Sequence, residues 1–158
     1  MTVALASELA RRNHRVMTIK HGHHSAEVDS KGSDSWRHFN EGKADRVLLA
    51  TPTMRAVFER SEDEYDPIGL TRRYLSGADI VLVEGFKRSD LPKIEVYRSS
   101  LTDPPLYDPD APNADEWVAI VTDDPKLDAA CPLLHFQDTM WLQLLAGLAW
   151  DQARVIPG

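Results

Sequence analysis

The sequence predicts an α/β domain with a doubly wound, mostly parallel sheet, and three observations support this prediction. Short apolar runs alternate along the chain with stretches of helical spacing, which is the order of elements in such folds. Two of these runs, at 78–86 and 117–124, are bounded by polar residues and have the apolar character of strands buried on both faces. The 158 residues fit one compact domain at 1–158, and 42% of them are hydrophobic, which is enough for a core.

The elements expected before the first of these runs follow from spacing and turn residues. In chain order they are a helix at 2–12, a strand at 15–20, a short helix at 33–39, two strands at 46–51 and 54–60, and a helix at 68–77. Ser33 or Asp34 is the expected cap of the short helix, and Gly77 is expected to close the last one. The two strands flank Pro52, and we expect them to form a hairpin.

The elements expected from residue 78 onward continue the alternation. They are strands at 78–86, 93–98, 117–124 and 133–136, and a closing helix at 138–155 with Asp138 as its cap. Residues 101–115 contain four of the ten prolines and are expected to be irregular. Ligands of doubly wound folds sit beyond the carboxyl ends of the strands. We therefore expect residues 20–24, 84–87 and 122–124 to face one crevice.

Charge and composition exclude several classes of protein. A formal net charge of −7 argues against a general nucleic-acid or anionic-membrane surface, because phosphates are bound chiefly by clustered Lys and Arg. The single cysteine, Cys131, excludes an internal disulfide and a Cys-rich zinc module. No apolar run approaches the roughly 18 to 20 residues of a membrane helix, and the N-terminus lacks the pattern of a signal peptide. We expect a cytoplasmic location.

Glu84 is the first candidate functional residue. It directly follows the apolar run VLV, and Gly85 after it allows close approach of the backbone. A carboxylate in this place resembles the acidic residue that orders Mg²⁺ and its water beside the phosphates of a nucleotide. The alternative is a helix-capping or surface glutamate.

Four motifs together point to a family. They are IKHGHH at 19–24, DSKGSDSWRH at 29–38, VLVEGFKR at 81–88 and PKIEVYR at 92–98. In this order and at these separations they closely resemble the MobB family, the adaptor proteins of molybdopterin guanine dinucleotide biosynthesis. The resemblance implies a GTP-binding P-loop NTPase domain, usually a homodimer, that assists the nucleotidyltransferase attaching GMP to molybdopterin. It implies at most weak GTPase activity.

The phosphate loop of that family is absent from these residues. Family members begin with a strand and a GxxGxGKT-type turn whose backbone N–H groups and lysine hold the phosphates. No GxxxxGK[ST] occurs in the 158 residues, and Met1 falls about where the family has the residue after its Lys-Thr-Thr. We therefore expect an N-terminally truncated form that lacks the first strand and the loop. A misassigned start, a shortened chain and a true loss remain open as explanations. The missing strand should lie beside residues 79–84 in the sheet.

The resemblance assigns further ligand-binding residues in the segment 29–35. Asp29, Asp34 and Ser35 match a D-x-x-G-x-D-S stretch that is similar to a loop near the γ-phosphate and Mg²⁺. Asp29 is the preferred second metal carboxylate beside Glu84. The alternative for Asp34 and Ser35 is a solvated polar loop that caps the following helix.

Three further residues complete the candidate nucleotide site. Lys20 ends a strand and could neutralise phosphate charge, although a plain surface position is as plausible. Thr122 and Asp123 occupy the place where related nucleotide-binding proteins contact the base. The Asn-Lys-x-Asp guanine signature is absent, so a preference for guanine rests on the resemblance alone.

The histidines after Lys20 raise a different possibility. In an extended segment His21 and His23 share a face and His24 lies opposite, so at most two converge without Glu27 or Asp29. Zinc usually takes three or four ligands, which disfavours a structural metal site. The favoured interpretation places these histidines, His21 among them, in the crevice, where a neutral imidazole offers one donor and one acceptor to phosphate or molybdopterin. The rival functions are a nucleotide-free scaffold and a metal-binding protein.

Overall fold

The computed structural model describes residues 1–22, 29–61 and 66–157, and these form two compact units. The first unit comprises Met1–His21 and Asp66–Gly158, and the second comprises Gly22–Tyr65. The predictions for His23, His24 and Glu27 concern positions outside the described residues.

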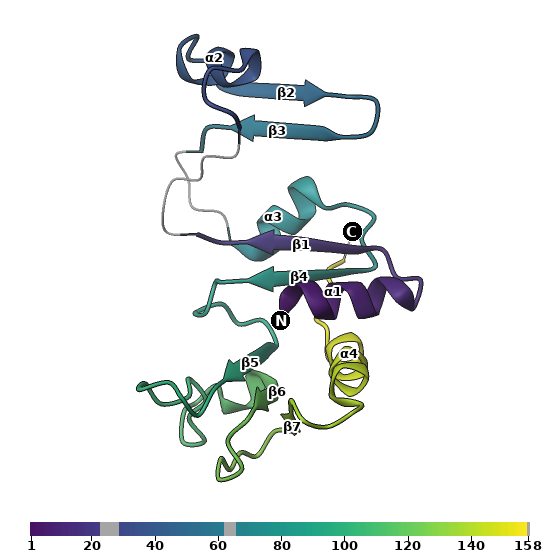
Figure 1. Cartoon of the computed structure of the whole chain (residues 1–158), viewed down its shortest axis with the longest axis vertical. Coiled ribbons are helices and arrows are strands. Elements are labelled where there is room, and N and C mark those ends of the chain that lie inside the picture. Colours follow the sequence, from purple (N-terminus) through teal and green to yellow (C-terminus); the bar gives the residue numbers. More distant parts are fainter. Residues whose placement is uncertain (23–28, 62–65, 158) are drawn as a thin grey trace. The chain divides into compact units, whose positions relative to one another are not determined.

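The strands of the first unit form two parallel sheets (Figure 1). In one sheet β1 (Val16–Lys20) pairs with β4 (Ile80–Glu84), and the last residues of the two strands, Lys20 and Glu84, are register partners. The other sheet contains β5 (Lys93–Tyr97), β6 (Trp117–Thr122) and β7 (Leu133–His135), in that order. The predicted mostly parallel α/β fold is confirmed.

The strand β4 differs from the prediction in its burial. Ile80 is buried, but Val81, Leu82 and Val83 are only half-buried, so the expected burial on both faces is wrong for most of the strand. The reason lies in the pairing: β4 pairs with β1 along one edge, and no strand in the described ranges pairs with the other edge. The edge of β5 that faces away from β6 is likewise unpaired within those ranges.

Three α-helices accompany these sheets in the described part of the first unit: α1 (Thr2–Arg11), α3 (Pro67–Tyr74) and α4 (Trp141–Asp151). A short 3-10 helix, η1 (Ala114–Glu116), ends the otherwise irregular proline-rich segment. Asp66 caps α3 by accepting hydrogen bonds from the N–H groups of Ile68 and Gly69. None of the helices in the described ranges has the length and apolar character needed to cross a membrane.

Two predicted helix ends are wrong. Asp138 does not cap α4, which begins after Met140, because the N–H of Asp138 bonds to His135 in the turn that leaves β7. Gly77 lies beyond the end of α3, whose C-cap is Leu75, and serves instead as a left-handed turn residue with a φ of 84°. In both cases the residue lies in a turn next to the helix, before α4 or after α3, and not at the end of the helix itself.

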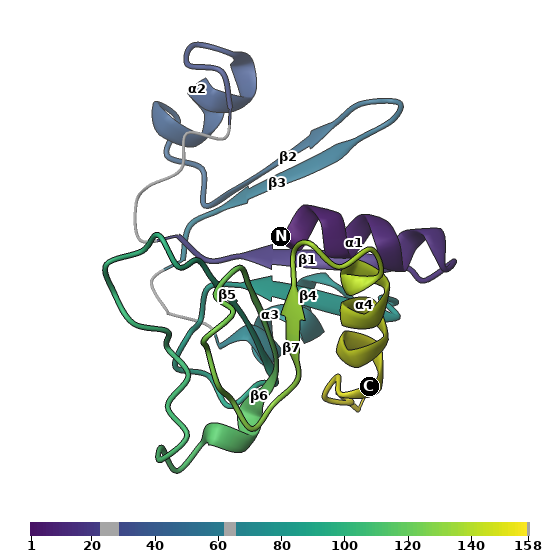
Figure 2. The ribbon, with the colours of Figure 1, turned by 60° about the horizontal axis from the view of Figure 1, so that its bottom comes forward.

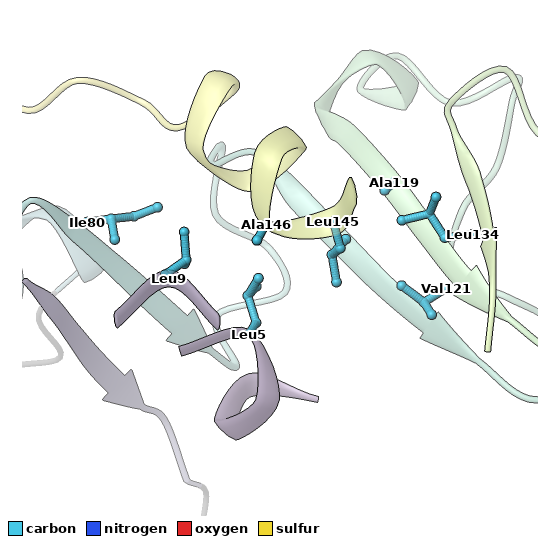
Figure 3. Packing of buried hydrophobic residues seen from close by; sticks show 8 residues of the cluster. All are labelled: Leu5, Leu9, Ile80, Ala119, Val121, Leu134, Leu145 and Ala146. Carbon is cyan, nitrogen blue, oxygen red and sulfur yellow. The ribbon is translucent and has the colours of Figure 1, made fainter. Parts of the chain in front are cut away.

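The core of the first unit joins α1 and α4 to both sheets (Figures 2 and 3). Its buried members are Leu5 and Leu9 of α1, Ile80 of β4, Ala119 and Val121 of β6, Leu134 of β7, and Leu145 and Ala146 of α4. Figure 3 shows α4 directing Leu145 toward Val121 and Leu134, while Ala146 lies near Leu5 and Leu9. Helix α4 therefore connects the two parallel sheets through apolar contacts.

The described residues of the second unit, 22 and 29–61, contain one helix and a hairpin. Helix α2 (Asp34–Asn40) is capped by Ser33, whose Oγ accepts a hydrogen bond from the N–H of Trp36, as predicted. The strands β2 (Arg46–Ala50) and β3 (Arg55–Glu59) pair antiparallel, which confirms the predicted hairpin.

Candidate functional site

The carboxyl ends of β1 and β4 bring Lys20 and Glu84 together. The Lys20 ammonium donates a hydrogen bond to the Glu84 carboxylate, and the N–H of His21 donates to the Glu84 carbonyl at 2.8 Å. The side chains of Lys20 and Glu84 are 70% and 46% exposed. Since the ion pair is open to water, it contributes little to stability and leaves both groups accessible to a ligand.

The electrostatics of Glu84 favour its charged form. The pKa of Glu84 is lowered, first by the hydrogen bond from Lys20, then by a hydrogen bond from Thr2 and by the positive charge of Lys20. An ionised, half-exposed carboxylate at this position suits Mg²⁺ or one of its waters, because Mg²⁺ is bound through carboxylate oxygens and retains several waters.

The turn after Glu84 depends on a glycine. Gly85 has a φ of 104°, and a Cβ built on it would meet the Cβ of His21 at 2.7 Å. The close approach predicted at Gly85 is therefore an approach to His21. Phe86 also has a positive φ, 49°, which is rare for an aromatic residue, and its ring stacks on that of His21 with centroids 4.2 Å apart.

Phe86 is a residue that sequence reasoning missed. Its contact with His21 couples the ends of β1 and β4, and so it helps to fix the Lys20–Glu84 pair. The only signal in the sequence was its place two residues after Glu84 in VLVEGFKR. A strained backbone at this position is typical of functional sites.

Asp29 lies in a hydrogen-bonded loop of the second unit. Its carboxylate accepts from the N–H of Ser30 at 2.7 Å and from the hydroxyl of Ser33 at 3.0 Å. The pKa of Asp29 is lowered, chiefly by a hydrogen bond from Ser35, with smaller contributions from Ser33 and Ser30. The carboxylate is ionised at neutral pH and is compatible with a role as a metal ligand.

The remaining candidates in this loop have local roles. The hydroxyl oxygen of Ser35 lies 3.4 Å from that of Ser33, and Asp34 is exposed at the first position of α2, where a negative charge suits the helix dipole. Both positions fit the alternative interpretation, in which a solvated polar loop caps α2. Asp29, Asp34 and Ser35 belong to one unit and Glu84 to the other, so a Mg²⁺ ion shared by Asp29 and Glu84 stays a prediction.

Thr122 and Asp123 end β6 in different environments. Thr122 is fully buried, and its Oγ1 accepts a hydrogen bond from the N–H of Asp124 at 3.0 Å, so it shapes the turn. Asp123 accepts from the N–H of Ser99 at 2.7 Å and lies 3.4 Å from a guanidinium nitrogen of Arg98. The pKa of Asp123 is lowered, first by the Ser99 backbone hydrogen bond.

The described residues contain no cluster of ligand side chains that supports the metal-binding interpretation. No group of three or more His, Cys, Asp or Glu side chains in residues 1–22, 29–61 and 66–157 could hold a metal ion. His21, the one histidine of the 21–24 segment within those ranges, stacks on Phe86.

Comparison with known proteins shows the family of the chain. The family model described as molybdopterin guanine dinucleotide synthesis protein B, MobB, matches residues 1–123. The chain belongs to the MobB family. The molybdopterin-guanine dinucleotide biosynthesis adapter protein of Haemophilus influenzae is 37% identical to it over 131 residues, which are 82% of this chain and 70% of the relative. The adapter protein of Escherichia coli is 32% identical over 136 residues, 85% of this chain and 75% of the relative.

A solved MobB structure has a similar fold. The crystal structure of Bacillus subtilis MobB matches with a TM-score of 0.64 and 18% sequence identity, over 98% of this chain and 91% of that chain. At this identity the likeness concerns the fold alone. It supports the α/β architecture of the MobB family member described here.

Proposed function

We propose that the chain is an adapter of molybdopterin guanine dinucleotide biosynthesis that binds GTP and Mg²⁺ and assists the nucleotidyltransferase of that pathway. The relatives from H. influenzae and E. coli bear the adapter name. The observation that carries nucleotide binding is the Lys20–Glu84 pair at the carboxyl ends of two parallel strands. Lys20 offers a cation to a phosphate, Glu84 offers oxygen to Mg²⁺, and bound Mg²⁺ would neutralise phosphate charge.

We further propose that a strand and a GxxGxGKT-type loop outside residues 1–158 complete the site. These residues contain no GxxxxGK[ST] sequence. Within the described ranges one edge of β4 is unpaired, and its backbone groups are available to such a strand. A loop that follows this strand would lead into α1, whose Leu5 and Leu9 share a core with Ile80 of β4.

The first test concerns the metal role of Glu84. In a version of the chain that binds GTP, Glu84→Gln is expected to weaken Mg²⁺-dependent binding about tenfold or more and Mg²⁺-free binding much less, because the amide removes the charge that attracts the cation. Calorimetric titration with GTP, with and without magnesium, measures both. Glu41→Gln is the matched control, since Glu41 is an exposed glutamate paired with Arg37 on α2. Equal losses with and without magnesium would refute the metal role.

The second test concerns a homodimer formed through the hairpin. Leu48 and Val57 are register partners on the exposed face of β2 and β3, and they are 60% and 52% exposed. Paired exposed apolar residues of this kind mark an interaction surface. Replacing them together, Leu48→Lys with Val57→Glu, keeps a favourable cross-strand pair but removes the apolar surface, so monomers are expected.

Light scattering over a range of concentrations measures this change. Val155→Lys is the control, because Val155 is 86% exposed and lies outside the hairpin. A monomeric unmodified chain at high concentration would exclude the homodimer. A double variant that stays dimeric would exclude the hairpin as its interface.

A further inference from the structure

The carboxyl ends of β5, β6 and β7 meet at one edge of their sheet. Tyr97, Thr122 and His135 are the last residues of these strands, and they are register partners across the sheet. The residues that follow directly are therefore neighbours at this edge: Arg98, Asp123 and Phe136.

These three side chains form a layered arrangement. The guanidinium carbon of Arg98 lies 3.7 Å from the centroid of the Phe136 ring, and a guanidinium nitrogen lies 3.4 Å from the Asp123 carboxylate. Phe136 therefore covers Arg98 on one side, yet the Arg98 side chain remains 49% exposed. A planar cation supported in this way presents a flat surface on which another planar group can stack.

The carboxylate of Asp123 is held in position by the backbone. The N–H of Ser99 donates to its Oδ1 at 2.7 Å, and the buried Thr122 fixes the following turn through the N–H of Asp124. The Asp123 side chain is 26% exposed. Each carboxylate oxygen can accept more than one hydrogen bond, so acceptor capacity is left for a ligand.

We propose that Arg98 and Asp123 bind a planar 2-amino-4-oxopyrimidine ring, which guanine and pterins share. The ring would stack on the guanidinium of Arg98, and its ring N–H and exocyclic amino group would donate two parallel hydrogen bonds to Asp123. Adenine lacks this pair of neighbouring donors. The proposal rests on the proposed function, because both a guanine nucleotide and molybdopterin carry such a ring.

An ion pair at the opposite edge of the same sheet shows what a purely structural contact looks like in this chain. Lys93, at the start of β5, pairs with Glu116 just before β6, and their side chains are only 14% and 23% exposed. Lys93 also donates to the backbone carbonyls of Ser89 and Leu91. Its donors are thus largely used within the protein, whereas Arg98 and Asp123 are joined by one long contact and remain more exposed.

Ligands without phosphate test this site separately from the phosphate site. Titration of the 158-residue chain with guanosine, 6-hydroxymethylpterin and adenosine, followed by amide NMR, is expected to shift Ser99, Asp123 and Asp124 with the first two compounds and not with adenosine. Shifts with guanosine alone or with the pterin alone would support the site and identify the source of the ring. Absence of shifts with both, or equal shifts with adenosine, would overturn the proposal.

Substitutions identify the groups that act. Asp123→Asn keeps an oxygen for the N–H of Ser99 but places an amide against the ring donors, so affinity for guanosine and the pterin should fall about tenfold. Arg98→Lys keeps the charge and loses the planar surface, and a loss of several-fold is expected. Asp124→Asn is the matched control, because the Asp124 carboxylate accepts a hydrogen bond from the N–H of Lys126 at 2.9 Å and an amide oxygen can replace that acceptor.

The outcomes separate this proposal from the wider function. Tight Mg²⁺-dependent GTP binding that is unchanged by Asp123→Asn would overturn the ring site and leave the nucleotide function intact. Binding of guanosine that is sensitive to Asp123→Asn, with no gain from the triphosphate in a version carrying the phosphate loop, would keep the ring site and refute the phosphate site.

Discussion

Extending the chain before Met1 with a strand and a GxxGxGKT loop is expected to produce micromolar binding of GTP with Mg²⁺, while the 158 residues alone bind GTP weakly or not at all. A triphosphate carries several negative charges, and the chain has a net charge of −7. Lys20 is already paired with Glu84, so its charge is partly neutralised. The loop would supply backbone N–H groups and a lysine at the start of α1, where the helix dipole adds to their effect.

The same extension is expected to raise thermal stability. Val81, Leu82 and Val83 of β4 are only half-buried, and one edge of the strand has no partner strand in the described ranges. A paired strand would satisfy backbone groups and remove apolar surface from water, at about 25 cal/mol per Å². A gain of even ~1 kcal/mol corresponds to a rise in Tm of roughly 2–4 °C for a chain of this size.

Three proteins separate the effect of the extension on GTP binding from its effect on thermal stability. Calorimetric titration and melting curves are compared for the 158-residue chain, the extended chain, and an extended chain in which the loop lysine is replaced by alanine. The last should keep the stability gain and lose most GTP binding, because the strand is intact and the phosphate cation is absent. Micromolar GTP binding by the 158-residue chain, or an extension that leaves Tm unchanged, would contradict the proposed arrangement.

The regular elements were predictable because their signals are local. Helical spacing at 2–12, the apolar run ending at Lys20 and the Ser33 cap all specify structure within a few residues. The burial of β4 was not predictable in this way, because the half-exposure of Val81 to Val83 depends on which strands pair with it. A local pattern reports the environment a strand prefers and not the neighbours it has.

Only part of the candidate site was predictable, because some of its contacts depend on which strands are neighbours. Lys20 and Glu84 were found because strand ends in parallel sheets bring polar residues together, and the structure pairs them. Arg98 and Phe136 were missed because they follow different strands, and although Arg98 ends the motif PKIEVYR, nothing in that motif points to Phe136. Their contact depends on the register of β5, β6 and β7, which the sequence does not display.

Gly85→Ala is expected to lower both stability and Mg²⁺-dependent binding, although it adds only one methyl group. The φ of 104° is unfavourable for alanine, and the new Cβ would lie 2.7 Å from the Cβ of His21. A strained backbone of this kind costs roughly 1–3 kcal/mol. Relief of the clash must move His21 or the turn, and either movement displaces the Glu84 carboxylate, because the N–H of His21 is bonded to the Glu84 carbonyl.

Gly147→Ala is a control variant that is expected to raise the stability of the protein, whereas Gly85→Ala lowers it. Gly147 lies within α4, and nothing lies within 4 Å of a Cβ built on it. Alanine there should stabilise the helix by up to about 1 kcal/mol, since glycine has a poor helix propensity. Melting curves should therefore move in opposite directions for the two variants. If Gly85→Ala melts at the temperature of the unmodified chain, the turn accommodates a side chain, and His21 and Phe86 do not hold Glu84 in the way argued here.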